Sequence, residues 1–172
     1  MRHLVIVRHA KASPAENGGS DYDRRLSGRG KRQCEQLRAW ASDAASLGAY
    51  GPTTALVSSA ARTRETFHRA FDDTPFVTSV NYSDLIYNGR RDVTAEDLLI
   101  DLAAIDPVTT SLLVVAHNPT VHELVEILAA PVPEVLDERG YPLGGAFVLA
   151  LPDDQPIGLA SYAVVAQFIP DV

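Results

Sequence analysis

The chain has 172 residues, of which 46% are hydrophobic, and its 15 Lys and Arg against 22 Asp and Glu give a net charge of −7. This balance argues against nucleic acid or an anionic membrane as the main partner, so any anion site must be a local cluster of basic residues. Cys34 is the only cysteine, which excludes an internal disulfide and a cysteine-based zinc site.

The apolar runs of the chain are short. No apolar stretch approaches the ~18 residues of a membrane span, and the N-terminal apolar run is too short for a signal peptide. A length of 172 residues fits one domain, and no break in composition marks a second. We therefore expect residues 1–172 to form one domain of a soluble cytoplasmic protein with no membrane partner.

The first half of the chain alternates buried strands with amphipathic helices. Residues 3–8 (HLVIVR) are typical of a strand buried on both faces, as in a parallel sheet. A polar loop over 10–26 follows, and Ser27 can cap a helix of about twenty residues that ends within 48–52. The next predicted elements are a strand over 54–58, a helix over 59–71 and a short strand over 76–80.

The second half continues this alternation and ends in two adjacent strands. Its predicted elements are a helix capped by Thr94, a buried strand over 111–116, a helix opened by Asn118–Pro119 and ended by Pro131, and a Pro- and Gly-rich loop over 132–144. The last two strands, at about 145–151 and 161–168, have the spacing of a β-hairpin. The whole pattern predicts a three-layer α/β/α sandwich around a mostly parallel, mixed sheet.

Polar residues follow three of the predicted strands at the point where each strand ends. Arg8 and His9 follow the first strand, Arg62 lies just after the second, and His117 follows the 111–116 strand. In an open α/β sheet such junctions lie at the carboxyl edge, where ligands bind. Two of them are also helix N-termini, which favour anions. We expect these two arginines and two histidines to form one site for a dianionic group, with phosphoryl the natural candidate.

The pairing of Arg8 with His9 suits a nucleophilic histidine. The pKa of a free histidine is about 6.5. Neighbouring Arg8 and Arg62 would disfavour the imidazolium and keep His9 neutral, as a nucleophile requires. The same arginines would then bind the oxygens of the transferring phosphoryl group and stabilise its charge.

Other polar residues near these junctions have ordinary explanations. We expect Ser58 and Ser59 to be helix N-caps rather than ligand contacts. Arg62 could instead pair with Glu65, and His117 could hydrogen-bond to backbone beside its helix. No His-x-x-x-His spacing is present and arginines repel cations, so we expect no metal site. Five basic residues near the expected mouth are interpreted as solvated loop charges: Lys11, Arg24, Arg25, Arg90 and Arg91.

The motifs at these junctions resemble those of the histidine phosphatase superfamily, the phosphoglycerate mutase-like group. The family's Arg-His-Gly, Ser-Pro-x-x-Arg-x-x-x-Thr and Gly-His-Asn-Pro segments appear here as Arg8-His9-Ala10, Ser58 to Thr66, and Ala116-His117-Asn118-Pro119. The match is closest to its short branch, the SixA-type phosphohistidine phosphatases. That branch's Asp-x-x-Arg-x-Leu-Ser/Thr-x-x-Gly stretch resembles DYDRRLSGRG, from Asp21 to Gly30. The resemblance covers most of the chain, in order and with compatible spacing.

The resemblance implies a metal-independent phosphatase without cofactors. It implies that His9 becomes phosphorylated and that water then hydrolyses the phosphohistidine. Arg8, Arg62 and His117, with Asn118, would bind the phosphoryl oxygens. The substrate would be a phosphorylated small molecule or a phosphohistidine protein. The chain departs from the family pattern at three positions, where Ala10 and Ala116 replace glycine and Ser59 replaces proline; alanine is tolerable at negative φ and strained at positive φ.

The larger members of the superfamily also use a carboxylic acid as proton donor after the third strand. Asp84, Asp92 and Glu96 lie in that region here, and we take Asp84 as the first candidate. Phosphohistidine needs such an acid less than an alkyl phosphate ester does, because a protonated imidazole is already a good leaving group. The lack of a clear acid motif therefore favours phosphohistidine or another activated phosphate.

Two alternative functions stay open. A phosphoglycerate-type mutase is less expected, because the short chain has little room for insertions that would enclose its substrate. A phosphate- or phosphoprotein-binding module that has lost turnover is suggested by Ala10, by Ala116 and by the uncertain acid.

Overall fold

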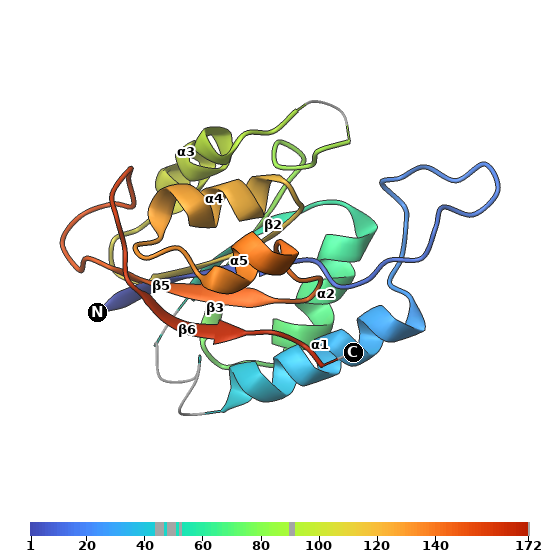
Figure 1. Ribbon diagram of the computed structural model, residues 1–172, viewed down its shortest axis with the longest axis horizontal. Coiled ribbons are helices and arrows are strands. Elements are labelled where there is room, and N and C mark those ends of the chain that lie inside the picture. Colours follow the sequence, from blue (N-terminus) through green and yellow to red (C-terminus); the bar gives the residue numbers. More distant parts are fainter. Residues whose placement is uncertain (44–46, 48–50, 52, 90–91, 172) are drawn as a thin grey trace.

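A six-stranded sheet lies at the centre of the computed structural model, which describes residues 1–43, 47, 51, 53–89 and 92–171 (Figure 1). The strands are β1 (Arg2–Arg8), β2 (Thr53–Ser58), β3 (Val77–Ser83), β4 (Ser111–Ala116), β5 (Ala146–Leu151) and β6 (Val164–Phe168). Their order is β3-β2-β4-β1-β5-β6. The first four pair in parallel, whereas β5 pairs antiparallel with both β1 and β6. The mixed sheet and its C-terminal hairpin are as predicted.

Helices cover both faces of the sheet, which makes the three layers predicted from the sequence (Figure 1). They are α1 (Gly28–Ser42), α2 (Ala61–Phe71), α3 (Ala95–Ile105), α4 (Thr120–Leu128) and α5 (Glu134–Arg139). Leu4 and Ile6 of β1 pack with residues of α3, α4 and α5, whereas Val5 and Val7 pack with α1 and α2. β1 is thus buried on both faces. Within the described part of the chain, no helix combines the length and apolar content needed to cross a membrane.

Several element boundaries differ from the sequence-based expectation, and one helix is additional. Strand β3 extends to Ser83 instead of ending at 80, and β6 begins at Val164 instead of 161. Helix α1 ends at Ser42, earlier than predicted, and the expected end at 48–50 and 52 lies outside the described residues. Helix α4 begins at Thr120 with Pro119 as its N-cap residue, so the predicted Asn118 cap is wrong. The predicted 132–144 loop contains α5, which was missed because six residues with one buried side chain carry no readable periodicity.

The first turn of α1 packs against the backbone that follows His9. Ser27 caps this helix as predicted, its Oγ accepting a hydrogen bond from the Gly30 N–H at 3.1 Å. A Cβ at Gly30 would lie 2.1 Å from the Lys11 carbonyl oxygen, so only glycine allows this close approach. Gln33 Oε1 accepts a hydrogen bond from the Lys11 N–H at 2.9 Å. Helix α1 therefore fixes the chain on the C-terminal side of His9.

Candidate active site

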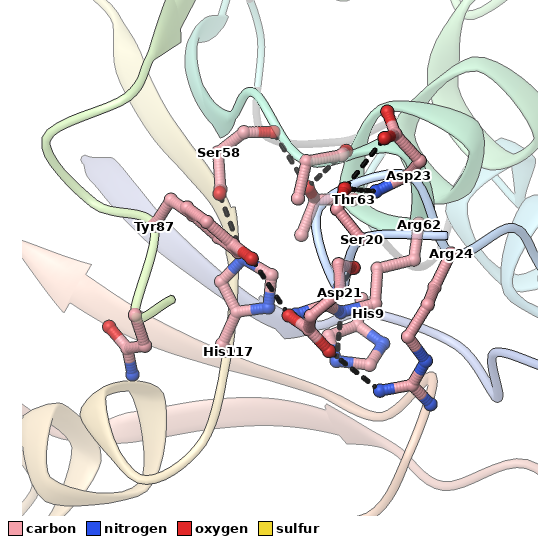
Figure 2. Close-up of polar contacts among 12 residues, drawn as sticks. His9, Ser20, Asp21, Asp23, Arg24, Ser58, Arg62, Thr63, Tyr87 and His117 are labelled. Carbon is pink, nitrogen blue, oxygen red and sulfur yellow. Dashed lines mark hydrogen bonds and ion pairs between the residues drawn. The ribbon is translucent and has the colours of Figure 1, made fainter. Parts of the chain in front are cut away.

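The carboxyl ends of β1, β4 and β2 bring the predicted residues together, because these strands are neighbours in the sheet. The rings of His9 and His117 lie 5.1 Å apart, centroid to centroid. Arg62, in the first turn of α2, donates from Nε to His9 Nε2 at 3.3 Å (Figure 2). Together with Arg8, these residues line one cavity of about 250 Å³, hereafter the His9 cavity. The predicted convergence of four distant residues is present in the structure.

The His9 cavity is strongly basic and is suited to an anion. Its polar lining consists of Arg8, Lys11, Arg24, Arg62, His9, His117, Asn88, Asn118 and Asp21. Arg8 Nε and His117 Nδ1 are buried and have no hydrogen-bond partner among the described residues. Buried polar atoms are normally satisfied, at a cost of about 1–3 kcal/mol when they are not. Two residues that line the cavity therefore carry donors that the described part of the chain leaves unsatisfied.

The hydrogen bonds of His9 determine which ring nitrogen is free. Its Nδ1 lies 2.8 Å from the carbonyl oxygen of Ala10. Because a carbonyl oxygen only accepts, Nδ1 must carry the hydrogen, and the lone pair of the neutral ring is on Nε2. Burial lowers the pKa of His9 to about 3, and the charges of Arg62 and Arg8 act in the same direction while the Ala10 contact opposes them. His9 is therefore a neutral imidazole whose Nε2 faces Arg62.

The Ser58 side chain contacts His117. The predicted role of Ser58 as a helix N-cap is therefore wrong. Ser58 Oγ lies 2.8 Å from His117 Nε2 (Figure 2). The N-cap residue of α2 is instead Ala60, without a side-chain hydrogen bond. Burial lowers the pKa of His117 well below its ordinary value, and His9 and Arg62 lower it further. In the tautomer in which Ser58 donates to Nε2, the free Nδ1 of His117 is a donor toward the cavity.

Ser59 is not a cap either, and it contacts the carboxyl group predicted as proton donor. Its Oγ donates to Asp84 Oδ1, which also accepts from the hydroxyl of Tyr22 at 3.3 Å. Asp84 is exposed and lies outside the lining of the His9 cavity, as do Asp92 and Glu96. The physical reason is the strand order: Asp84 follows β3, the edge strand, which β2 and β4 separate from β1.

Asp21 is the carboxylate that does line the cavity, and the sequence reasoning assigned it no role. Its Oδ2 accepts from Arg62 Nη2 at 3.0 Å and from the hydroxyl of Tyr87 at 2.8 Å, and its Oδ1 accepts from Arg24 Nη1 at 2.9 Å (Figure 2). Its carbonyl oxygen accepts from Arg62 Nη1 at 2.7 Å. Burial acts to raise the pKa of Asp21, but the hydrogen bonds from Arg24 and Tyr87 and the charge of Arg62 outweigh it and lower the pKa to about 2. The available signal was its position at the start of the DYDRRLSGRG stretch.

Of the other residues singled out in the sequence, some line the His9 cavity and others do not. Asn118 lines the cavity as predicted, and so do Lys11 and Arg24, which were interpreted as solvated charges. Arg25 is not part of the lining, and Arg90 and Arg91 lie outside the described residues. Arg62 pairs with Asp21, while Glu65 pairs with Arg69 at 3.0 Å, so the ordinary ion pair considered for Arg62 does not form.

The two alanines that replace family glycines cause no backbone strain. Among the described non-glycine residues, only Val108 has a positive φ. Ala10 and Ala116 therefore adopt backbone conformations open to any L-residue. In the same part of the chain, no group of three His, Cys, Asp or Glu side chains is arranged to hold a metal ion.

The low pKa of His9 predicts a specific dependence of stability on pH. The folded protein does not take up this proton until about pH 3, whereas an unfolded histidine takes it up near 6.5. Below pH 6.5 the unfolded state therefore binds more protons, and stability falls as the pH falls, by up to about 1.4 kcal/mol per pH unit for this residue. Urea unfolding between pH 7.5 and 4.5 should show a shallower decline for His9→Gln than for the wild type. Equal slopes would contradict the buried neutral state.

The chain is similar to known proteins both in sequence and in fold. No family model matches the sequence. An uncharacterized protein of Mycobacterium tuberculosis, MT1313, is 32% identical over 149 residues, which cover 83% of this chain and 85% of that protein. A crystal structure described as the phosphohistidine phosphatase SixA of Agrobacterium tumefaciens has 26% identity and a TM-score of 0.75, with 98% of each chain covered. Another structure described as a SixA, from Nakamurella multipartitia, has 25% identity and a TM-score of 0.70, covering 99% of this chain and 97% of its own.

Both structural neighbours match the chain along almost its whole length, and the four residues of the family motifs lie in one cavity. The chain belongs to the histidine phosphatase superfamily, the phosphoglycerate mutase-like group, in its SixA-type branch.

Proposed function

We propose that this protein is a metal-independent phosphatase that acts through a covalent phosphohistidine on His9. The observation that carries the proposal is the neutral His9, whose Nε2 lone pair faces Arg62 in a basic cavity. Its substrate is phosphohistidine, on a protein or peptide, or a small phosphoester. Residues 1–172 act as one domain in this reaction.

The reaction takes place in two steps. The Nε2 lone pair of His9 attacks phosphorus, an Nε2–P bond forms, and the bond from phosphorus to the leaving group breaks with its electron pair going to the leaving group. Water then attacks the same phosphorus, the Nε2–P bond breaks, and inorganic phosphate leaves. Arg8, Arg62 and His117, together with Asn118 of the cavity lining, stabilise the phosphoryl oxygens in both steps.

Contacts with Asp21 hold the Arg62 guanidinium in place for this reaction. Both Nη atoms are held by Asp21, through its carboxylate and its carbonyl oxygen. The guanidinium therefore keeps its position when Nε exchanges the His9 nitrogen for a phosphoryl oxygen. Accurate positioning of this kind contributes strongly to phosphoryl transfer, which depends on placement and charge more than on covalent chemistry.

The charge state of Asp21 favours an activated substrate. It is the only carboxylate in the described lining of the cavity, and with a pKa of about 2 it is ionised at neutral pH. An ionised carboxylate cannot protonate a leaving alkoxide. A phosphorylated imidazole can leave as a neutral ring after protonation by solvent. We therefore rank phosphohistidine above unactivated alkyl phosphates as the substrate.

The test compares substrates of graded leaving-group quality. Purified protein with excess EDTA is incubated with a phosphohistidine peptide, with para-nitrophenyl phosphate and with an alkyl phosphate, and released phosphate is measured. We expect turnover in that order. Transfer of the phosphoryl group to an added acceptor instead of water would favour a mutase. Tight binding of tungstate or phosphate without any turnover would favour a binding module and would refute the proposal.

A further inference from the structure

A second cavity lies beside the His9 cavity, and we propose that it binds an acidic side chain next to the phosphohistidine of a protein substrate. This flanking cavity, of about 350 Å³, has Arg8, Arg29, Gln33 and Arg139 on its polar side. It lies where the first turn of α1, the end of α5 and the segment before β5 meet. The inference rests on the proposed phosphatase function, because it names the kind of substrate that the same site would take.

The charge of the flanking cavity indicates an anionic ligand. Three guanidinium groups line it, and its described lining includes no carboxylate. Within the described part of the chain, the side chains of Arg29 and Arg139 form no hydrogen bond and no ion pair. Like charges around one cavity repel each other, and an anion placed among them relieves that repulsion.

The lack of partners for these arginines is notable in a chain with a net charge of −7. Some arginines elsewhere have acidic partners: Arg38 Nη2 lies 2.8 Å from Asp73, and Arg69 Nε lies 3.0 Å from Glu65. Others, such as Arg32, form no ion pair in the described part of the chain, but Arg29 and Arg139 line one cavity together with Arg8. The first turn of α1, which contains Arg29, has no acidic residue, although helix N-termini usually favour one. No described acidic side chain therefore forms an ion pair with Arg29 or Arg139 at this place.

Arg8 connects the two cavities. Arg8 and Leu143 belong to the lining of both. The Arg8 guanidinium is held between them by a hydrogen bond from Nη1 to the Tyr141 carbonyl oxygen at 2.6 Å. A substrate with its phosphoryl group on the His9 side of Arg8 can therefore extend a neighbouring group past Leu143 to Arg29 and Arg139.

The remaining walls of the flanking cavity favour a side chain over a free ion. Val135, Pro142 and Ile169 provide an apolar surface next to the guanidinium groups. A glutamate has this combination of chemistry, because its methylene stem is apolar and its carboxylate can accept bidentate hydrogen bonds from arginine. A compound whose only anionic group is its phosphate would leave this second set of arginines without a partner. The ligand class is therefore an acidic peptide segment.

The experiment measures whether loss of Arg29 and Arg139 raises the KM for acidic peptides without affecting other substrates. The double variant Arg29→Ala/Arg139→Ala is compared with wild type on three substrates: a phosphohistidine peptide flanked by glutamates, the same peptide flanked by glutamines, and phosphoramidate. We expect the KM for the glutamate peptide to rise about tenfold with little change in kcat, while kcat/KM for the other two changes less than twofold. The double variant Arg38→Ala/Arg69→Ala removes the same charge away from both cavities and should leave all three substrates unaffected.

Other outcomes would overturn the inference. Equal losses on all three substrates, or a wild type with no preference for the glutamate peptide, would show that the flanking cavity does not read acidic residues. Calorimetric titration of the unphosphorylated peptides separates this from a failure of the proposed function. If wild type turns over no substrate, a glutamate preference in binding that the double variant loses still supports the cavity's role, and its absence refutes it.

Discussion

Replacement of His9 by alanine is expected to lower kcat by about four orders of magnitude or more and to abolish the covalent phosphoenzyme. The imidazole supplies the only neutral nitrogen lone pair directed at Arg62, and no other described side chain offers a lone pair at that position. Without it, the arginines can still bind phosphate but cannot form the Nε2–P bond. The His9→Ala variant should therefore still bind phosphate but show no turnover above the residual rate.

The experiment measures the amount of covalent phosphoenzyme as well as kcat. Protein is mixed with radiolabelled phosphorylated substrate, quenched in alkaline denaturant, which preserves phosphohistidine, and assayed for bound label. The control is His68→Ala, which removes an exposed histidine that pairs with Asp72 at 3.3 Å on the outer face of α2. Label retained by His9→Ala, or lost equally in His68→Ala, would show that another residue carries the phosphoryl group.

Replacement of Arg62 by alanine is expected to lower kcat/KM by about a hundred- to a thousandfold and to weaken the binding of tungstate or phosphate. Arg62 Nε contacts His9 Nε2, the proposed nucleophile, so its loss would remove a donor from the point where charge would develop. Arg62→Lys should recover only part of the activity, because one ammonium nitrogen would replace three guanidinium nitrogens that contact His9 Nε2, the Asp21 carbonyl oxygen and Asp21 Oδ2 from separate positions.

The matched control for Arg62 lies in the same helix. Arg64→Ala removes an exposed guanidinium that lies 5.6 Å from the centroid of the Tyr82 ring, outside the His9 cavity. Its kinetics should equal those of the wild type. Oxyanion affinity that is unchanged in Arg62→Ala, measured by calorimetry, would mean that this arginine does not bind the phosphoryl group.

The buried strands and the residues at their ends could be predicted because their signals are local. Four apolar residues in a row mark β1, and the polar pair that follows marks its carboxyl end. The general rule that ligands bind at this edge of an α/β sheet then placed Arg8, His9 and His117 near each other. The register of β1 against β4, with Arg8 opposite Ala116, is what makes that rule hold here.

The presence of the Asp21 carboxylate in the His9 cavity could not be predicted, because the position of Asp21 depends on packing between distant parts of the chain. Asp84 is the first candidate from the sequence because it follows the third strand, but that strand is at the edge of the sheet and Asp84 does not line the His9 cavity. Asp21 reaches the cavity because its loop is attached to the rest of the fold, for example by the Ala61 N–H, which donates to the Tyr22 carbonyl oxygen at 2.9 Å. The contact between Ser58 and His117 could not be predicted either, because the two residues are 59 positions apart in the sequence.

The strand order also governs when, during synthesis and folding, this site can exist. β1 is synthesised before the other strands, yet its neighbours in the sheet are β4 and β5. Leu4 can therefore pair with Leu112 and Leu149 only after both of those residues have been synthesised. Pairings this remote in sequence close slowly, and domains of this kind fold as units. A nascent chain that has passed residue 117 therefore holds all four residues of the motif but still lacks the strand that covers the other edge of β1. Activity should arise late and all at once, and fragments that end before β5 should be inert.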